Sequence, residues 1–127
     1  MKLALDTNAC SAAARGEPRS VALVQAAQHV YLPFVVLAEL RAGFAAGTLG
    51  RRNEALLARF LSSPRVSVVY ADEQTTQHYA NVFAQLRRQG TPIPTNDIWI
   101  AATVLQHDLA LLTSDAHFSN LPQLARP

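Results

Sequence analysis

Four carboxylates stand out because of where they fall relative to apolar segments: Asp6, Glu39, Asp97 and Asp115. Asp6 and Asp115 each follow a short apolar segment of the strand type. Glu39 and Asp97 interrupt apolar helical segments, where a lone buried carboxylate costs on the order of several kcal/mol without a partner. A divalent cation would supply that partner. Oxygen ligands favour hard ions, so the four acids predict a site for Mg²⁺, with Mn²⁺ as a substitute.

Such an ion lowers the pKa of a bound water, orients it in line with a phosphorus atom and neutralises the leaving oxygen. The predicted reaction is hydrolysis of a phosphodiester bond. Polar residues beside the acids can hydrogen-bond to them, to metal-bound waters or to the phosphate: Thr7, Asn8, Asn96, Thr113 and Ser114. Helix capping and turn formation explain Asn8 and Asn96 equally well. His117 is left out of the predicted site, because a metal that activates water makes a general base unnecessary.

The elements that must position these acids alternate between short apolar strands and helices. Strands are predicted over residues 2–5, 29–32, 66–70 and 110–113. Helices are predicted over residues 9–14, 19–28, 34–44, 49–62, 72–89 and 97–106. This alternation predicts an α/β fold, with a short parallel sheet of about four to five strands flanked by helices on both faces. Open sheets of this kind bind ligands at the carboxyl ends of their strands, where Asp6 and Asp115 are expected.

The composition favours one compact domain over residues 1–127, because this length is close to the commonest domain size. Half of the residues are hydrophobic and 16% are charged, which excludes a disordered chain. A single cysteine, Cys10, excludes an intrachain disulfide and suits a reducing compartment. The first apolar run is interrupted at Asp6, too early for a signal peptide or a membrane span. We therefore expect a soluble, cytoplasmic protein without membrane association.

The charges are unevenly distributed over the molecule if the four acids share one site. The chain has 11 basic and 9 acidic side chains, and the site would leave 11 basic against 5 acidic, a net charge of +6 elsewhere. An acidic site on a basic body suits an enzyme that binds a polyanion and needs cations for its chemistry. The pairs Arg51-Arg52 and Arg87-Arg88 are candidate phosphate contacts, although solvated helix faces explain them as well.

Four segments in order resemble the four motifs of PIN-domain ribonucleases, specifically VapC-type toxins. They are Leu5-Asp6-Thr7-Asn8, Ala38-Glu39-Leu40-Arg41-Ala42-Gly43, Asn96-Asp97-Ile98-Trp99-Ile100-Ala101-Ala102 and Leu112-Thr113-Ser114-Asp115-Ala116-His117-Phe118. The resemblance covers essentially the whole chain and implies a PIN-like, Rossmann-like fold. By motif matching, it implies that Asp6, Glu39, Asp97 and Asp115 are the catalytic, metal-binding acids, with Thr113 as a polar helper.

The resemblance also implies a biological role and partners. Relatives of this type are Mg²⁺-dependent endoribonucleases of type II toxin-antitoxin pairs, so RNA is the implied substrate. They are usually homodimers, and a VapB-like antitoxin, whose C-terminal segment wraps the toxin near its active site, joins them in a hetero-oligomer on operator DNA. Residues 34–62 would form part of the antitoxin groove, although core packing explains their apolar stripe equally well. Residues 120–127 depart from the pattern, because they leave little room for the last short strand of many relatives.

Two other functions compete with this prediction. A non-catalytic PIN-fold module could bind nucleic acid or regulate a partner without cleaving RNA, since fold does not fix function. The presence of all four acids argues against such a loss. A phosphotransfer protein could use Asp6 as the phosphate acceptor, but such proteins need a lysine near the phosphoryl group. The only lysine is Lys2, at the far end of the first predicted strand.

Overall fold

The strands form one parallel sheet in the computed structural model, which describes residues 1–127. The sheet has four strands in the order β3-β2-β1-β4, so the first strand of the chain lies at its centre. The strands are β1 (Lys2–Leu5), β2 (His29–Pro33), β3 (Val66–Val69) and β4 (Ala110–Leu112). Leu3, Ala4 and Leu5 are fully buried, which explains why β1 is apolar at successive positions rather than at alternate ones.

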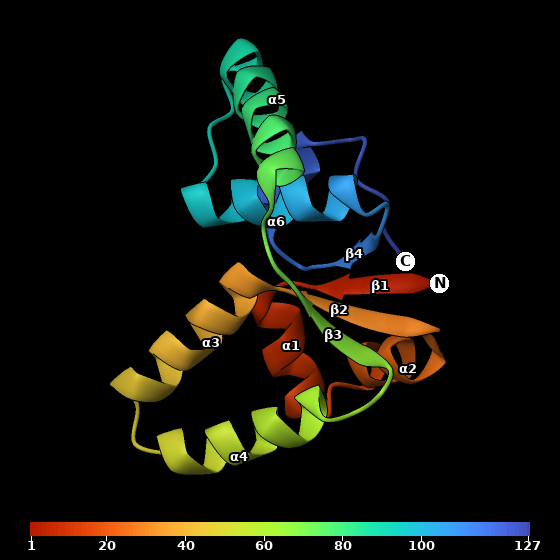
Figure 1. The fold of residues 1–127 in the computed structure, drawn as a ribbon, viewed down its shortest axis with the longest axis vertical. Coiled ribbons are helices and arrows are strands. Elements are labelled where there is room, and N and C mark those ends of the chain that lie inside the picture. Colours follow the sequence, from red (N-terminus) through yellow and green to blue (C-terminus); the bar gives the residue numbers. More distant parts are fainter.

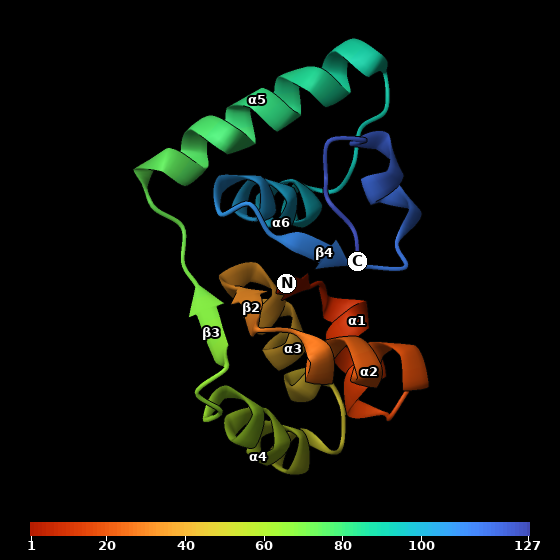
Figure 2. The same ribbon diagram turned by 90° about the vertical axis from the view of Figure 1, so that its right-hand side faces the viewer.

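The helices lie on both sides of this sheet (Figures 1 and 2). They are α1 (Thr7–Ala14), α2 (Pro18–Ala26), α3 (Phe34–Ala46), α4 (Gly50–Leu61), α5 (Glu73–Gln89), α6 (Thr95–Gln106) and the short 3₁₀ helix η1 (Ala116–Asn120). In both views α5 and α6 lie on one side of the strands and α1 to α4 on the other. The predicted α/β fold with a parallel sheet and helices on both faces is confirmed.

The strand register sets the position of the polar residues that follow the strands. Leu5 at the end of β1 pairs with Leu112 at the end of β4. Because the two strands are parallel neighbours, the next residues, Asp6 and Thr113, emerge side by side at the same edge. The amide of Asp6 donates to the carbonyl of Leu112 at 3.4 Å and extends the ladder to this point. The register therefore brings together two positions that are more than one hundred residues apart in the chain.

Local signals explain where the long helix α5 begins and ends. Asp72 accepts a hydrogen bond from the amide of Thr75, and the Thr75 hydroxyl accepts one from the amide of Asp72, a reciprocal capping box. Gly90 ends the helix with a φ of 69°, a conformation that glycine adopts without steric cost. α5 packs along α6, with the rings of Tyr79 and Trp99 at a centroid distance of 4.3 Å. This packing holds α6, which carries Asp97, against the rest of the fold.

The element bounds differ from those predicted by a few residues at the ends. α1 begins at Thr7, because Asp6 caps it directly, and α6 begins at Thr95, just after the rigid Pro94. α2 ends at Ala26, two residues earlier than predicted. The last strand is reduced to one bridge, in which the Leu111 amide donates to the Ala125 carbonyl at 2.8 Å. None of the helices combines the length and apolar character that crossing a membrane requires.

Candidate functional site

Asp6 is the most deeply buried of the four acids, with 4% of its surface exposed. It lies directly after β1 and caps α1, because one carboxylate oxygen accepts the amide hydrogen of Ala9 at 2.8 Å. Its other oxygen accepts a hydrogen bond from the Thr113 hydroxyl. Both oxygens are therefore held by short contacts, and the carboxylate is fixed at the carboxyl edge of the sheet.

Thr113 connects Asp6 to Asp115. The Thr113 hydroxyl donates to Asp6 and accepts a hydrogen bond from the backbone amide of Asp115 at 2.9 Å. Asp115 in turn caps η1, because its carboxylate accepts the amide hydrogen of His117 at 2.9 Å. Thr113 thus hydrogen-bonds to both strand-end acids and holds Asp6 and Asp115 next to each other.

Glu39 reaches this edge from α3. Its carboxylate accepts a hydrogen bond from the Thr7 hydroxyl at 2.6 Å, and Thr7 is the first residue of α1. Thr7 and Asp6 are consecutive, so this contact places Glu39 beside the end of β1. The predicted flanking residue Thr7 therefore holds an acid, as Thr113 does.

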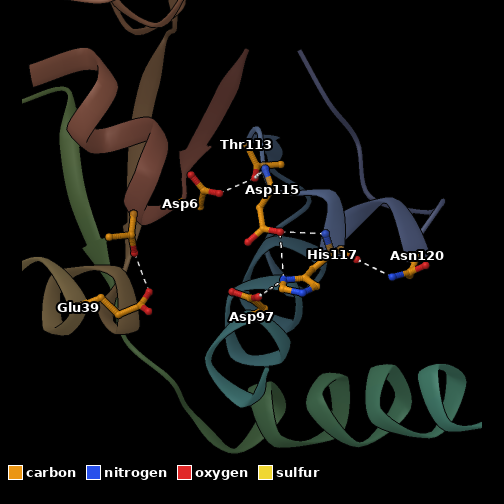
Figure 3. Close-up of polar contacts among 8 residues, drawn as sticks. Asp6, Glu39, Asp97, Thr113, Asp115, His117 and Asn120 are labelled. Carbon is orange, nitrogen blue, oxygen red and sulfur yellow. Dashed lines mark hydrogen bonds and ion pairs between the residues drawn. The ribbon is translucent and has the colours of Figure 1, made fainter. Parts of the chain in front are cut away.

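Asp97 enters from the first turn of α6, and 15% of its side chain is exposed. The Nδ1 atom of His117 lies 3.2 Å from Oδ2 of Asp97 and 3.0 Å from Oδ1 of Asp115. Figure 3 shows Asp6, Glu39, Asp97 and Asp115 facing one region, with His117 between the last two. We call these four residues the acidic cluster. Two strand ends and two helices, which are separate in the sequence, supply it.

Two members of the acidic cluster, Asp6 and Asp97, have raised pKa values. Burial raises the pKa of Asp6, and the charges of Asp115 and Glu39 raise it further, against the hydrogen bonds from Thr113 and Ala9. Burial also raises the pKa of Asp97, as do the charges of Asp115 and Glu39, while His117 opposes the shift. Like charges therefore repel one another at this site.

No lysine or arginine forms an ion pair with the acidic cluster. The ion pairs in the structure join Arg41 to Glu54 and His117 to Asp97 and Asp115. Carboxylate oxygens from four places thus converge, and the His117 imidazole is the one basic side chain that contacts them. Asp97, Asp115 and His117 each offer one ligand atom within 4.8 Å of the others. This donor set fits a divalent cation, which would supply the missing positive charge.

The other predicted flanking residues, Asn8, Asn96 and Ser114, are exposed. The side-chain hydrogen bonds of the acidic cluster are made instead with Thr7, Ala9, Thr113 and His117. His117, by contrast, lies inside the site although sequence reasoning left it out. Its place two residues after Asp115 was the available signal, because the backbone turn at η1 folds that residue back onto the acid.

An apolar groove of about 520 Å³ lies beside the acidic cluster, between α1 and α2 on one wall and α3 and α4 on the other. Eleven of its 15 lining residues are hydrophobic. Leu56 lines it while remaining 47% exposed, and Leu57 and Phe60 lie on the same face of α4. Leu5 and Cys10 also line it, so the groove touches the β1–α1 segment that carries Asp6.

Comparison with known proteins decides the family. The family model of the PIN domain matches residues 3–124, which is nearly the whole chain. The chain belongs to the PIN-domain family. The resemblance to PIN-domain proteins of the VapC type is therefore confirmed.

The relatives and structural neighbours of this PIN domain are toxins, ribonucleases and toxin-antitoxin complexes. It is 31% identical to ribonuclease VapC1 of Haemophilus influenzae over 86% of this chain and 83% of VapC1. It is 34% identical to toxin FitB of Neisseria gonorrhoeae, over 87% and 86% of the two chains. Its fold is similar to that of VapBC2 from Rickettsia felis bound to promoter DNA, with a TM-score of 0.86, 26% identity and coverage of 100% and 98%.

Proposed function

We propose that this PIN-domain protein is the toxin of a type II toxin-antitoxin pair, an Mg²⁺-dependent endoribonuclease that hydrolyses RNA phosphodiester bonds. The observation that carries the proposal is the convergence of Asp6, Glu39, Asp97 and Asp115 from four separate elements. The names of the relatives, ribonuclease and toxin, support the same activity for this chain. Because the proposed substrate is RNA, we also propose that the protein acts in the cytoplasm.

Each acid has a defined part in this proposal. Asp97 and Asp115, which each offer an oxygen within 4.8 Å of the other, would bind the cation directly. Asp6 and Glu39 would complete the ligand field, and Thr113 and Thr7 would hold them in position. A bound Mg²⁺, or Mn²⁺ in its place, would supply a water nucleophile at neutral pH and charge neutralisation at the leaving oxygen.

The raised pKa values within the acidic cluster support cation binding. Burial is the main cause for Asp6 and Asp97, and the neighbouring carboxylates Asp115 and Glu39 add to it. A bound cation would offset both effects by stabilising the charged carboxylates. The basic residues outside the cluster, ten arginines and Lys2, would attract the RNA backbone.

The apolar groove is the proposed docking site of a VapB-like antitoxin. VapBC and FitAB complexes are among the solved structures with similar folds, some of them bound to DNA. An apolar antitoxin segment in the groove would bury Leu56 and contact α1, whose first turn carries Thr7 of the acidic site. The complex would bind operator DNA as a hetero-oligomer of toxin dimers.

The competing functions receive less support. A phosphotransfer protein needs a cation beside its aspartate, but Lys2 begins the strand that Asp6 follows, so the two are separated by the whole length of β1. A non-catalytic module would not need four acids at one edge of the sheet.

The test uses antitoxin-free protein and a labelled RNA substrate. We expect cleavage that stops with a chelator, resumes with Mg²⁺ and is lost in Asp97→Asn. Asp108→Asn is the matched control, because Asp108 is exposed, undergoes the same change of charge and has a φ of 53° that asparagine tolerates. Full cleavage by Asp97→Asn, or cleavage unaffected by the chelator, would contradict the proposed function.

A further inference from the structure

We infer that His117 is a direct ligand of the bound divalent cation, through Nδ1, and that it gives the site a preference for Mn²⁺ over Mg²⁺. This inference rests on the proposed function, because it concerns the cation that the acidic cluster would hold. It adds to the four carboxylates a nitrogen ligand from a different element, η1.

The distances around His117 fit a shared cation. Nδ1 lies 3.2 Å from Oδ2 of Asp97 and 3.0 Å from Oδ1 of Asp115. An octahedral ion with bonds of about 2.1 Å holds adjacent ligand atoms about 3.0 Å apart. The three atoms come from α6, from the loop after β4 and from η1, and yet they all lie within 4.8 Å of one another. Both distances from Nδ1 thus match the spacing of neighbouring ligands of one ion.

The backbone fixes His117 in this position. Its amide donates to Asp115 at 2.9 Å, and its carbonyl accepts a hydrogen bond from the Asn120 side chain at 3.2 Å. The next residue, Phe118, is 1% exposed and anchors η1 in the core. The ring is thus held over the two carboxylates by a rigid turn, while 47% of its side chain remains exposed.

In the absence of a cation, Nδ1 of His117 contacts the two carboxylates directly. One N–H at Nδ1 then faces two carboxylate oxygens and offsets part of their repulsion. With a cation bound, the ring would take the tautomer that carries its hydrogen on Nε2, so that the Nδ1 lone pair faces the ion. The cation would then replace the hydrogen-bond donor that Nδ1 offers to Asp97 and Asp115.

A nitrogen ligand changes which cation the site prefers. Carboxylates and water suit Mg²⁺, whereas imidazole binds first-row transition ions better than it binds Mg²⁺. His117 should therefore increase the affinity for Mn²⁺ more than the affinity for Mg²⁺. The site could still use Mg²⁺ through its oxygen ligands.

The experiment combines calorimetric titration with Mn²⁺ and with Mg²⁺ and pulsed electron paramagnetic resonance of bound Mn²⁺, on full-length, antitoxin-free protein. We expect ¹⁴N modulation from one imidazole in the wild type and none in His117→Gln. We also expect Mn²⁺ affinity to fall at least about tenfold in His117→Gln, with a smaller loss for Mg²⁺. His107→Gln is the matched control, because His107 is exposed and lies at the opposite end of α6 from Asp97.

The possible outcomes separate this inference from the proposed function. Bound Mn²⁺ without a nitrogen signal in the wild type would overturn the role of His117 and leave the proposed function standing. Equal Mn²⁺ affinities of His117→Gln and wild type would do the same. A wild-type protein that binds neither ion would contradict the proposed function itself.

Discussion

The acidic cluster and the apolar groove are adjacent, but they are built in opposite ways. The acidic cluster gathers like charges whose burial raises the pKa values of Asp6 and Asp97. The groove instead leaves apolar side chains such as Leu56 accessible to solvent. Each is an unfavourable arrangement for an isolated folded chain, and each becomes favourable when its partner binds. In the proposed function, a cation would compensate the first, and an apolar antitoxin segment would cover the second.

The β1–α1 segment is common to both regions. Leu5 and Cys10 line the groove. Asp6 belongs to the acidic cluster, and Thr7 donates a hydrogen bond to Glu39 of that cluster. Functional regions of this kind are expected to depart from the pattern that maximises stability. The comparison therefore yields predictions that change one region and measure the other.

The largest expected effect is on RNA cleavage when an acid is removed. Asp6→Asn keeps a side chain that can cap α1, so the fold should be retained. Loss of one charged ligand should reduce the cleavage rate by at least about a hundredfold. The affinity for antitoxin should remain within a few-fold of the wild type, because Asp6 does not line the groove. Cleavage assays and antitoxin titrations measure the two effects, and equal losses in both would remove the distinction between the regions.

Cation binding should stabilise the fold through the acidic cluster. A ligand at a hundred times its dissociation constant stabilises a protein by about 2.7 kcal/mol, which raises the Tm of a domain of this size by several degrees. We expect this shift when Mn²⁺ is added to wild-type protein at pH 7.5, and its loss in Asp97→Asn. Thermal unfolding followed by circular dichroism measures it. A shift that persists in Asp97→Asn would place the cation elsewhere.

A charge introduced into the groove should affect the antitoxin alone. Leu56→Asp places a carboxylate on an apolar wall that an antitoxin segment would cover. We expect the affinity for the antitoxin to fall by about 2 kcal/mol, or roughly thirtyfold. Since Leu56 is 47% exposed, the fold should tolerate the change, and Mn²⁺ affinity should remain within twofold. Ala55→Asp, an exposed position on the same helix but outside the groove lining, is the matched control because it introduces the same charge. Unchanged antitoxin affinity in Leu56→Asp would show that the groove is not the docking site.

The smallest expected effect is the stability cost of the acidic cluster. The pKa values of Asp6 and Asp97 are raised in the folded protein, so folding holds these protons more tightly than the unfolded chain does. Stability of the metal-free protein from these groups therefore falls as the pH rises from about 4 through the folded pKa values. At pH 7.5, metal-free Asp97→Asn should be slightly more stable than the wild type, a difference that should disappear near pH 4.

Urea unfolding at the two pH values measures this difference. Carboxyls with lowered pKa values, such as Asp72 and Glu17, are present in both proteins and cancel in the comparison. A variant less stable than the wild type at pH 7.5 would contradict the raised pKa of Asp97.

The sequence was sufficient for the part of the site that follows from strand pairing. Short apolar strands alternating with helices predict a parallel sheet, and parallel strands bring their following residues to one edge. Asp6 and Thr113 meet for that reason, through the pairing of Leu5 with Leu112. The element ends were less predictable, because α1 and α6 start at local caps rather than at the first apolar residue.

Residues that depend on helix rotation or on a turn were harder to predict. Neighbouring residues on a helix point about 100° apart, so Asn8 and Asn96 diverge from Thr7 and Asp97 and remain exposed. The position of His117 depends on the 3₁₀ turn after Asp115, which leaves no periodic pattern in the sequence. The roles of the acids and of Thr113 in catalysis remain predictions for the experiments above.

Anomalous X-ray scattering from a crystal of the antitoxin-free protein soaked in Mn²⁺ tests the central claim most directly. The account predicts a manganese peak within bonding distance, about 2.2 Å, of carboxylate oxygens of Asp97 and Asp115, with Asp6 and Glu39 directed toward it. A fully soaked crystal with no peak at these residues, or with manganese bound only elsewhere, would contradict the account.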